Sequence, residues 1–148
     1  MPHVSKSRCK MGLTHLHLTV NAKIDPNFSQ LPKEKAQEFV DELLRITDMK
    51  PLGGMQWADA VDLDFPGQSY VQMVTTSHTS LHFFADTHEI YFDMYSCKEF
   101  DPQKVLEHLD KAFGLREWHG IMYSRETGKK PGLMRIGSTK KELLVIRN

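Results

Sequence analysis

Residues 70–96, YVQMVTTSHTSLHFFADTHEIYFDMYS, decide the fold. Three runs within this stretch, 70–76, 80–85 and 89–96, are rich in β-branched and aromatic residues, which predicts three strands. Asp86-Thr87 separates the last two runs and is typical of a turn. Strands joined by such short connections must pair as antiparallel neighbours, so the stretch predicts the centre of an antiparallel sheet.

One helix is predicted on each side of this stretch. Before it, apolar residues at helical spacing indicate a helix over about residues 32–48, with a buried stripe of Ala36, Phe39, Val40, Leu43, Leu44 and Ile46. After it, Asp101 is typical of a helix N-cap, Pro102 of the first helical position and Gly114 of a helix end. The stripe of this second helix is Val105, Leu106, Leu109, Ala112 and Phe113.

The outer segments add strands. We expect strands over residues 12–20, 57–65, 118–124 and 143–147, with turns at 25–27 and 65–68 and a loop over 126–131. The resulting order predicts an α+β two-layer sandwich, in which two helices cover one face of an antiparallel sheet. A length of 148 residues predicts a single domain spanning residues 1–148.

Composition excludes several classes of protein. The formal net charge is zero, which argues against a broad basic face for nucleic acid. No apolar run reaches the about 18 residues of a membrane helix, and polar residues around His15 and His17 interrupt any signal-peptide core. Two cysteines, Cys9 and Cys97, form no disulfide framework. We therefore expect a cytoplasmic protein with no nucleic-acid or membrane partner, in which Cys97 is a reduced thiol.

A group of residues at fixed spacing carries the chemical signal. Ser77 lies within Thr-Ser-His, His82 follows five residues later, and Cys97 fifteen residues after that, at the end of Asp-Met-Tyr-Ser-Cys. Ser69 lies eight residues before Ser77. This pattern, with the helix start at Asp101, resembles the short prokaryotic S-adenosylmethionine decarboxylases over residues 69–113.

The resemblance implies an activity and a role for each residue. The chain would cleave itself between Thr76 and Ser77, and Ser77 would become a pyruvoyl cofactor that serves as an electron sink in decarboxylation. His82 would remove the α-proton of Ser77 during processing, Ser69 would hold the ester intermediate, and Cys97 would return a proton to the substrate carbon. The family also implies a homodimer, a small-molecule substrate and a place in polyamine (spermidine) biosynthesis.

One position departs from the family pattern. The family has Glu before the cleavage serine, where this chain has Thr76. Because that carboxylate is expected beside the substrate amine, two alternatives remain open. One is an unprocessed homologue that acts as a binding or regulatory module, and the other is a pyruvoyl decarboxylase of another amino acid, such as ornithine or arginine.

The histidines permit a rival hypothesis. His15 and His17 fall on one face of the first predicted strand, and with His78, His82 or His88 they could form a metal site. The opening strand is also faintly similar to that of the vicinal-oxygen-chelate enzymes. Exposed strand histidines are more often solvated, so our preferred prediction contains no metal.

Two further groups have ordinary explanations. Four aromatic residues could stack on an adenine ring, but core packing is the more common role of such residues. They are Trp57, Phe65, Phe83 and Phe84. The alternating acidic run of Asp59, Asp62 and Asp64 could attract a cationic substrate, but such runs usually face solvent. The lysine pairs at 129–130 and 140–141 are expected to be surface charge.

Overall fold

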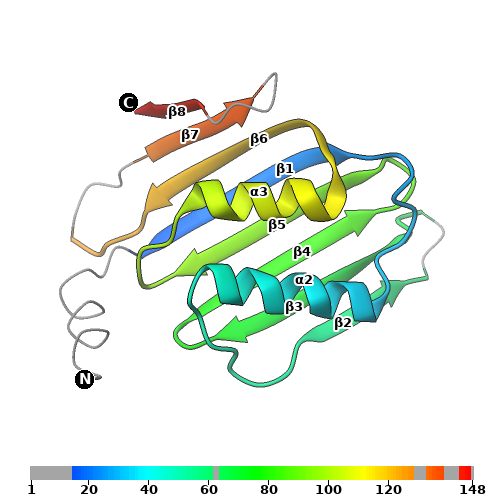
Figure 1. Cartoon of the computed structure of the whole chain (residues 1–148), viewed down its shortest axis with the longest axis horizontal. Helices are drawn as coiled ribbons and strands as arrows, with labels where there is room; N and C mark the ends of the chain where they lie inside the picture. The colour runs from blue at the N-terminus through cyan, green and yellow to red at the C-terminus, as the bar shows by residue number, and fades with distance from the viewer. Residues whose placement is uncertain (1–14, 62–63, 129–132, 139–143, 148) are drawn as a thin grey trace.

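The computed structural model describes residues 15–61, 64–128, 133–138 and 144–147. Eight strands form one sheet in the order β2-β3-β4-β5-β1-β6-β7-β8, and every neighbouring pair is antiparallel. The strands are β1 (Leu16–Ile24), β2 (Gln56–Ala60), β3 (Gly67–Val74), β4 (Ser77–Phe84), β5 (Glu89–Ser96), β6 (Leu115–Ser124), β7 (Leu133–Ser138) and β8 (Leu144–Arg147). Helices α2 (Lys33–Ile46) and α3 (Pro102–Phe113) lie side by side on the same face of the sheet (Figure 1). The predicted α+β two-layer sandwich is confirmed.

The boundaries of several elements differ from the prediction. β4 begins at Ser77 instead of residue 80, because Val74 pairs with Ser77 and leaves only Thr75 and Thr76 as the turn. β1 continues to Ile24, where its antiparallel partners in β5 and β6 also extend. β2 ends at Ala60, which pairs with Gly67, the first residue of β3. β7 was not predicted, and residues 12–14 lie outside the described part of the chain.

Helix α3 begins and ends where the sequence indicates, whereas α2 ends at Ile46 instead of at about residue 48. Asp101 accepts a hydrogen bond from the backbone N–H of Gln103 at 2.9 Å, which satisfies a free donor of the first turn of α3. Gly114 ends the same helix in the left-handed conformation, with φ of 68°. α2 follows Pro32, whose side chain gives no capping hydrogen bond.

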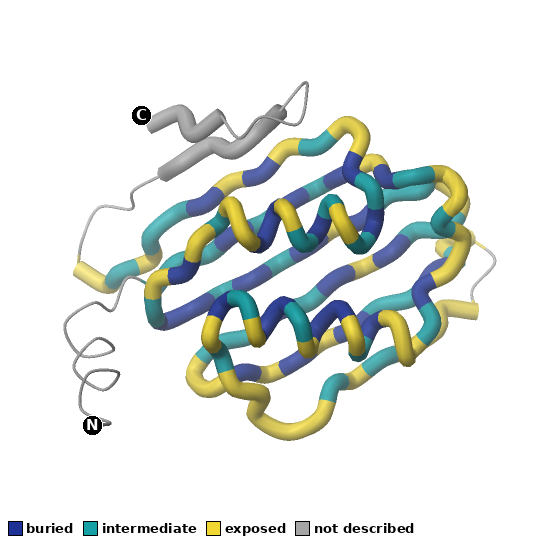
Figure 2. Tube along the Cα trace, viewed as in Figure 1, coloured by how far each residue is buried: buried dark blue, intermediate teal, exposed yellow. Residues whose placement is uncertain are grey.

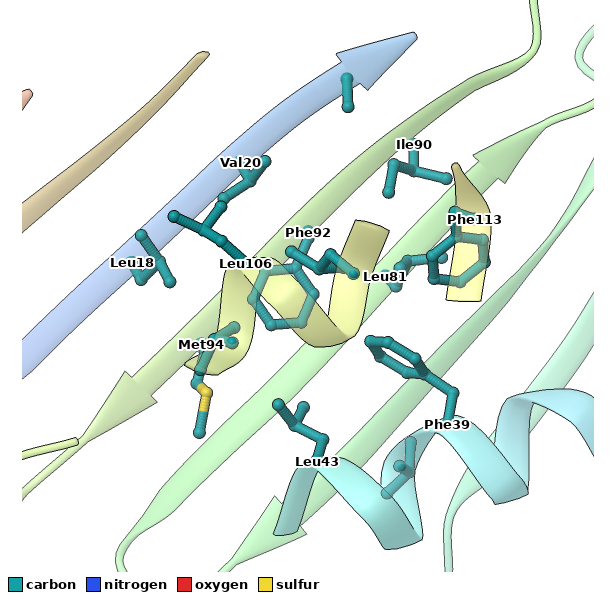
Figure 3. Packing of buried hydrophobic residues seen from close by; sticks show 14 of the residues in the cluster. Leu18, Val20, Phe39, Leu43, Leu81, Ile90, Phe92, Met94, Leu106 and Phe113 are labelled. Carbon is teal, nitrogen blue, oxygen red and sulfur yellow. The ribbon is translucent and has the colours of Figure 1, made fainter. Parts of the chain in front are cut away.

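The core fills the space between the helices and the sheet. Alternate residues of the central strands point toward the helices and are buried, while the residues between them are not (Figure 2). Phe39 and Leu43 of α2 and Leu106 and Phe113 of α3 pack onto this surface around Phe92 (Figure 3). Burying one such side chain stabilises the fold by roughly 1.5–3 kcal/mol. Ile46 was expected in this layer but lies partly exposed at the end of α2.

The opposite side of the sheet, called the open face below, is covered by neither described helix. Its side chains come from the alternate positions of the same strands and include His17, Ser69, His78, His82 and Asp93. Among the described residues, neither helix is both long and apolar enough to cross a membrane.

Candidate functional site

Thr76, Ser77 and Cys97 form a strand-end cluster. The β3–β4 turn lies beside the residue that follows β5, because β4 pairs with both strands. The hydroxyl of Ser77 accepts a hydrogen bond from the backbone N–H of Cys97 at 3.1 Å. The Oγ1 of Thr76 lies 3.0 Å from the Sγ of Cys97. Both residues at the expected cleavage point therefore contact the expected proton donor.

The backbone of Thr76 is strained. Its φ is 54°, in the left-handed region that a residue with a Cβ rarely adopts. This conformation costs an L-residue roughly 1–2 kcal/mol, and Thr is further restricted by its branched Cβ. Its side chain is held by a hydrogen bond from its own hydroxyl to the carbonyl of Thr75 at 2.8 Å. The strain lies at the peptide bond whose cleavage the sequence predicts.

The side chain of Cys97 is buried. Its backbone and thiol are fixed by the two contacts to the β3–β4 turn. The thiol is thus enclosed beside the strand end, as a proton donor shielded from bulk water requires. Cys9 lies outside the described residues.

Ser69 and His82 form a second pair, on the open face. They stand opposite each other in the β3–β4 ladder, and the Oγ of Ser69 shares a 2.7 Å hydrogen bond with the Nδ1 of His82. This bond orients the imidazole of His82, and its Nε2 forms no hydrogen bond with another described residue. The structure therefore brings together two of the four predicted catalytic residues here, and the other two at the strand end.

The two pairs are separated within one chain. Ser77 and His82 belong to the same strand, so five residues place their Cα atoms about 16 Å apart. An odd spacing along a strand also directs their side chains to opposite faces of the sheet. The His82 of one chain therefore does not reach the α-proton of Ser77 in the same chain.

A third group lies on the open face between these pairs. His17 from β1 and His78 from β4 both converge on Asp93 of β5, with their Nε2 atoms 2.8 Å and 3.4 Å from its Oδ1. Partial burial acts to raise the pKa of the Asp93 carboxyl, but the hydrogen bond and charge interactions with His17 and His78 outweigh it, and the pKa is lowered. These three residues are the only His, Cys, Asp or Glu group in the described part of the chain that is arranged to hold a metal ion.

The other predicted histidines do not join this group. His15 shares a 2.6 Å hydrogen bond with the hydroxyl of Tyr95, His82 pairs with Ser69, and His88 contacts the backbone carbonyl of Phe28. Sequence reasoning missed Asp93 as the shared partner. The alternating pattern of β5 places Asp93 on the other face of the sheet from the buried apolar residues. Only the pairing of β1 with β5 shows that His17 is its neighbour.

The aromatic and acidic candidates lie mainly elsewhere. Phe83 is buried in the core, and the indole N–H of Trp57 donates to the carbonyl of Leu31. Asp59 accepts a hydrogen bond from Gln68. Phe65 is exposed, and Phe84 lies on the open face against Tyr91. Asp62 and the lysines at 129–130 and 140–141 lie outside the described residues.

The comparison with protein families agrees with the motif. A family model described as S-adenosylmethionine decarboxylase matches residues 17–126, which include all of the predicted site residues. No curated protein matches the chain. The chain belongs to the S-adenosylmethionine decarboxylase family, and membership supports a decarboxylase-like function on a small-molecule substrate.

Proposed function

We propose that this protein is a pyruvoyl-dependent S-adenosylmethionine decarboxylase that cleaves itself between Thr76 and Ser77. The observation that carries the proposal is the strand-end cluster, in which Thr76 and Ser77 both contact Cys97. Family membership supplies the reaction class. It is also the basis for proposing a single cytoplasmic domain that contributes to polyamine synthesis.

The strand-end cluster suits self-cleavage. The Oγ of Ser77 attacks the carbonyl carbon of Thr76, the C–N bond breaks, and the amide becomes an ester with a free amine on Ser77. Removal of the α-proton of Ser77 then expels the Thr76 carboxylate and leaves dehydroalanine, which water converts to a pyruvoyl group with loss of ammonia. Strain at Thr76 favours the first step, because breaking this bond releases the left-handed conformation.

The chain's own residues fit the group that would result. Ser77 begins β4, so the new N-terminus stays anchored by the strand beside the buried thiol of Cys97. The pyruvoyl group supplies an electron sink for loss of the substrate carboxylate. In this arrangement Cys97 delivers a proton to the substrate carbon, and Thr76 becomes a C-terminal carboxylate next to the thiol.

We further propose that the protein works as a homodimer in which Ser69 and His82 act on the partner's strand end. Two features support this. His82 is about 16 Å along the strand from its own Ser77. Of the seven large hydrophobic residues that are exposed in the described part of the chain, four lie on the open face, namely Val71, Met73, Tyr91 and Ile121. Apolar residues gathered on one uncovered face are typical of a surface that another chain covers.

The cleavage is tested by the intact mass of the purified, folded protein after prolonged incubation. We expect fragments 1–76 and 77–148, the second blocked at its N-terminus by a keto group. Ser77→Ala is the control and remains one chain. A wild-type chain that stays intact and unmodified favours the alternative of an unprocessed binding or regulatory homologue.

The role of the partner is tested by mixing two inactive variants. Alone, His82→Ala should stall at the ester, which hydroxylamine cuts, and Ser77→Ala cannot form the ester. When the two are co-expressed, the Ser77→Ala chain offers an intact His82 to the His82→Ala chain, and cleavage of the latter should return. If His82 served its own chain, co-expression would restore nothing.

The substrate is the finer question, because the family's Glu is replaced by Thr76. Turnover of S-adenosylmethionine should be compared with that of ornithine and arginine, using the cleaved protein. A preference for either amino acid would retain the pyruvoyl chemistry and replace the proposed substrate.

A further inference from the structure

We propose that His17, His78 and Asp93 form a binding site for a divalent transition-metal ion such as Zn²⁺ or Co²⁺. The three side chains come from three adjacent strands, β1, β4 and β5, and meet on the open face. The site does not depend on self-cleavage, since none of its residues belongs to the strand-end cluster.

The sheet register brings the ligands together. His17 and His78 are both paired with Tyr95, one on each side of β5, and Asp93 lies two residues along from Tyr95 on the same face. The two imidazoles therefore approach one carboxylate from opposite sides. Their rings lie edge to face with centroids 6.2 Å apart, and the Nε2 atoms of both rings lie near the Oδ1 of Asp93.

The distances fit an ion of this size. Metal–ligand bonds of about 2.0–2.1 Å in a tetrahedral site separate neighbouring ligand atoms by about 3.3 Å. The Oδ1 of Asp93 lies 2.8 Å and 3.4 Å from the two Nε2 atoms, and all three ligand atoms lie within 4.8 Å of one another. Small side-chain movements are enough to place an ion between them.

The ligand types decide the class of metal. Two imidazoles and one carboxylate suit Zn²⁺, Co²⁺ or Ni²⁺, whereas Mg²⁺ and Ca²⁺ prefer oxygen ligands. Three protein ligands leave a coordination position open for water or another small molecule. His78 and Asp93 are partly exposed, so the open coordination position of the ion faces away from the core.

The surroundings of His17 include one favourable and one opposing group. Its Nδ1 lies 3.1 Å from the hydroxyl of Tyr123 and 3.2 Å from the Nη1 of Arg125. A guanidinium only donates hydrogen bonds, so in this state the Nδ1 of His17 is the acceptor and its Nε2–H points to Asp93. Binding a metal through Nε2 displaces that proton, and the neutral ring then carries its proton on Nδ1. The Nδ1–H must donate a hydrogen bond, which the hydroxyl of Tyr123 can accept and the guanidinium of Arg125 cannot.

Because Arg125 opposes metal binding and Tyr123 favours it, substitutions at the two positions should change the metal affinity in opposite directions. Arg125→Gln removes a competing cation and a competing donor, and should strengthen metal binding. Tyr123→Phe removes the acceptor for the Nδ1 proton and should weaken binding by about 10–100-fold, as loss of an outer partner of a ligating histidine does.

The test is a titration of the full-length protein with Co²⁺, followed by its visible absorption and by competition with Zn²⁺. We expect one Co²⁺ per chain. His78→Ala and Asp93→Asn, of which the second keeps the shape of the side chain, should each weaken binding at least about tenfold. His119→Ala is the matched control, because His119 is an exposed histidine on the same face outside the group.

The proposal is overturned by any of three results. These are no binding by the wild type, equal binding by wild type and Asp93→Asn, or a loss in His119→Ala equal to that in His78→Ala, which would indicate scattered surface histidines. Weaker binding in Arg125→Gln would overturn the part assigned to His17, because loss of a competing donor at its Nδ1 should strengthen a site that binds through its Nε2.

Discussion

The two faces of the sheet are built from the same strands but differ in their side chains: one face forms the apolar core, and the other carries polar groups. In β4, Leu81 and Phe83 face the helices and are fully buried, whereas the neighbouring residues His78 and His82 face outward and carry hydrogen bonds. Residues that stabilise the core therefore alternate along one strand with residues that form the polar groups of the open face. A shift of one residue in the pairing of β4 would exchange the two sets, so the core that fixes the register also positions the polar groups of the open face.

The largest effect is expected when the difference between the two faces is tested by replacing two neighbouring phenylalanines. Phe83 is 2% exposed and meets Phe28 edge to face, whereas Phe84 lies on the open face against Tyr91. Phe83→Ala should lower the free energy of unfolding by about 3–5 kcal/mol, and Phe84→Ala by about 0.5–1.5 kcal/mol. Urea denaturation measures both. Equal losses would mean that the partner chain of the proposed homodimer buries Phe84 as completely as the helices bury Phe83.

The second prediction separates catalysis at the strand end from processing. Cys97→Ser preserves the size of the side chain and should still yield two fragments, since the thiol acts after cleavage. Its turnover per cleaved chain should fall on the order of 10²-fold or more, the usual contribution of a positioned acid. The measurement is decarboxylation normalised to pyruvoyl content. Turnover equal to that of the wild type would make Cys97 an inert buried thiol.

Much of the covered face was predictable, because helical stripes and alternating strands are local signals. The stripe of α2 was confirmed except for Ile46, which is partly exposed, and the Asp101 and Gly114 ends of α3 were confirmed. The β3–β4 turn was misplaced, because Thr75 and Thr76 favour strands and only the pairing of Val74 with Ser77 makes them a turn. Long-range pairing overrode local propensity at the proposed cleavage point.

The open face was predictable only in part. The spacing of five between Ser77 and His82 already implied opposite faces of a strand, once both were known to lie in β4. The meeting of His17 with Asp93 was not predictable, since it depends on β1 lying between β5 and β6 in the sheet. Nothing local in either segment indicates that neighbour.

A smaller effect is expected from placing Glu at position 76, where the sequence resemblance predicts one. A carboxylate beside a substrate ammonium contributes about 1.5–3 kcal/mol, which corresponds to roughly 10–100-fold in affinity. Thr76→Glu should therefore tighten S-adenosylmethionine binding by that order, and Thr76→Gln, which has the same shape without the charge, should not. Binding is measured on cleaved protein by calorimetry. An equal gain in both variants would assign the effect to shape, and no gain in either would remove position 76 from substrate recognition.

The smallest expected effect concerns a polar residue on the covered side. His108 of α3 stacks on Phe39 of α2, with ring centroids 4.5 Å apart, and its Nε2 lies 2.9 Å from the carbonyl of Phe39. Burial between the helices lowers the pKa of His108 below its usual 6.5, although the hydrogen bond to Phe39 and the charge of Glu42 partly oppose the shift. The unfolded chain therefore binds this proton more readily than the folded one.

The sign of the pH dependence follows from that difference. Above pH 6.5 His108 is neutral in both states and costs nothing, whereas below pH 6.5 protonation favours the unfolded chain until the folded state also takes up the proton. Compared with His108→Phe, the wild type should lose stability as the pH falls from 8 to about 5. The prediction is wrong if the urea midpoints of the two proteins run parallel across this range, or if the wild type gains stability in acid. Either result would show that the helix layer tolerates the charge.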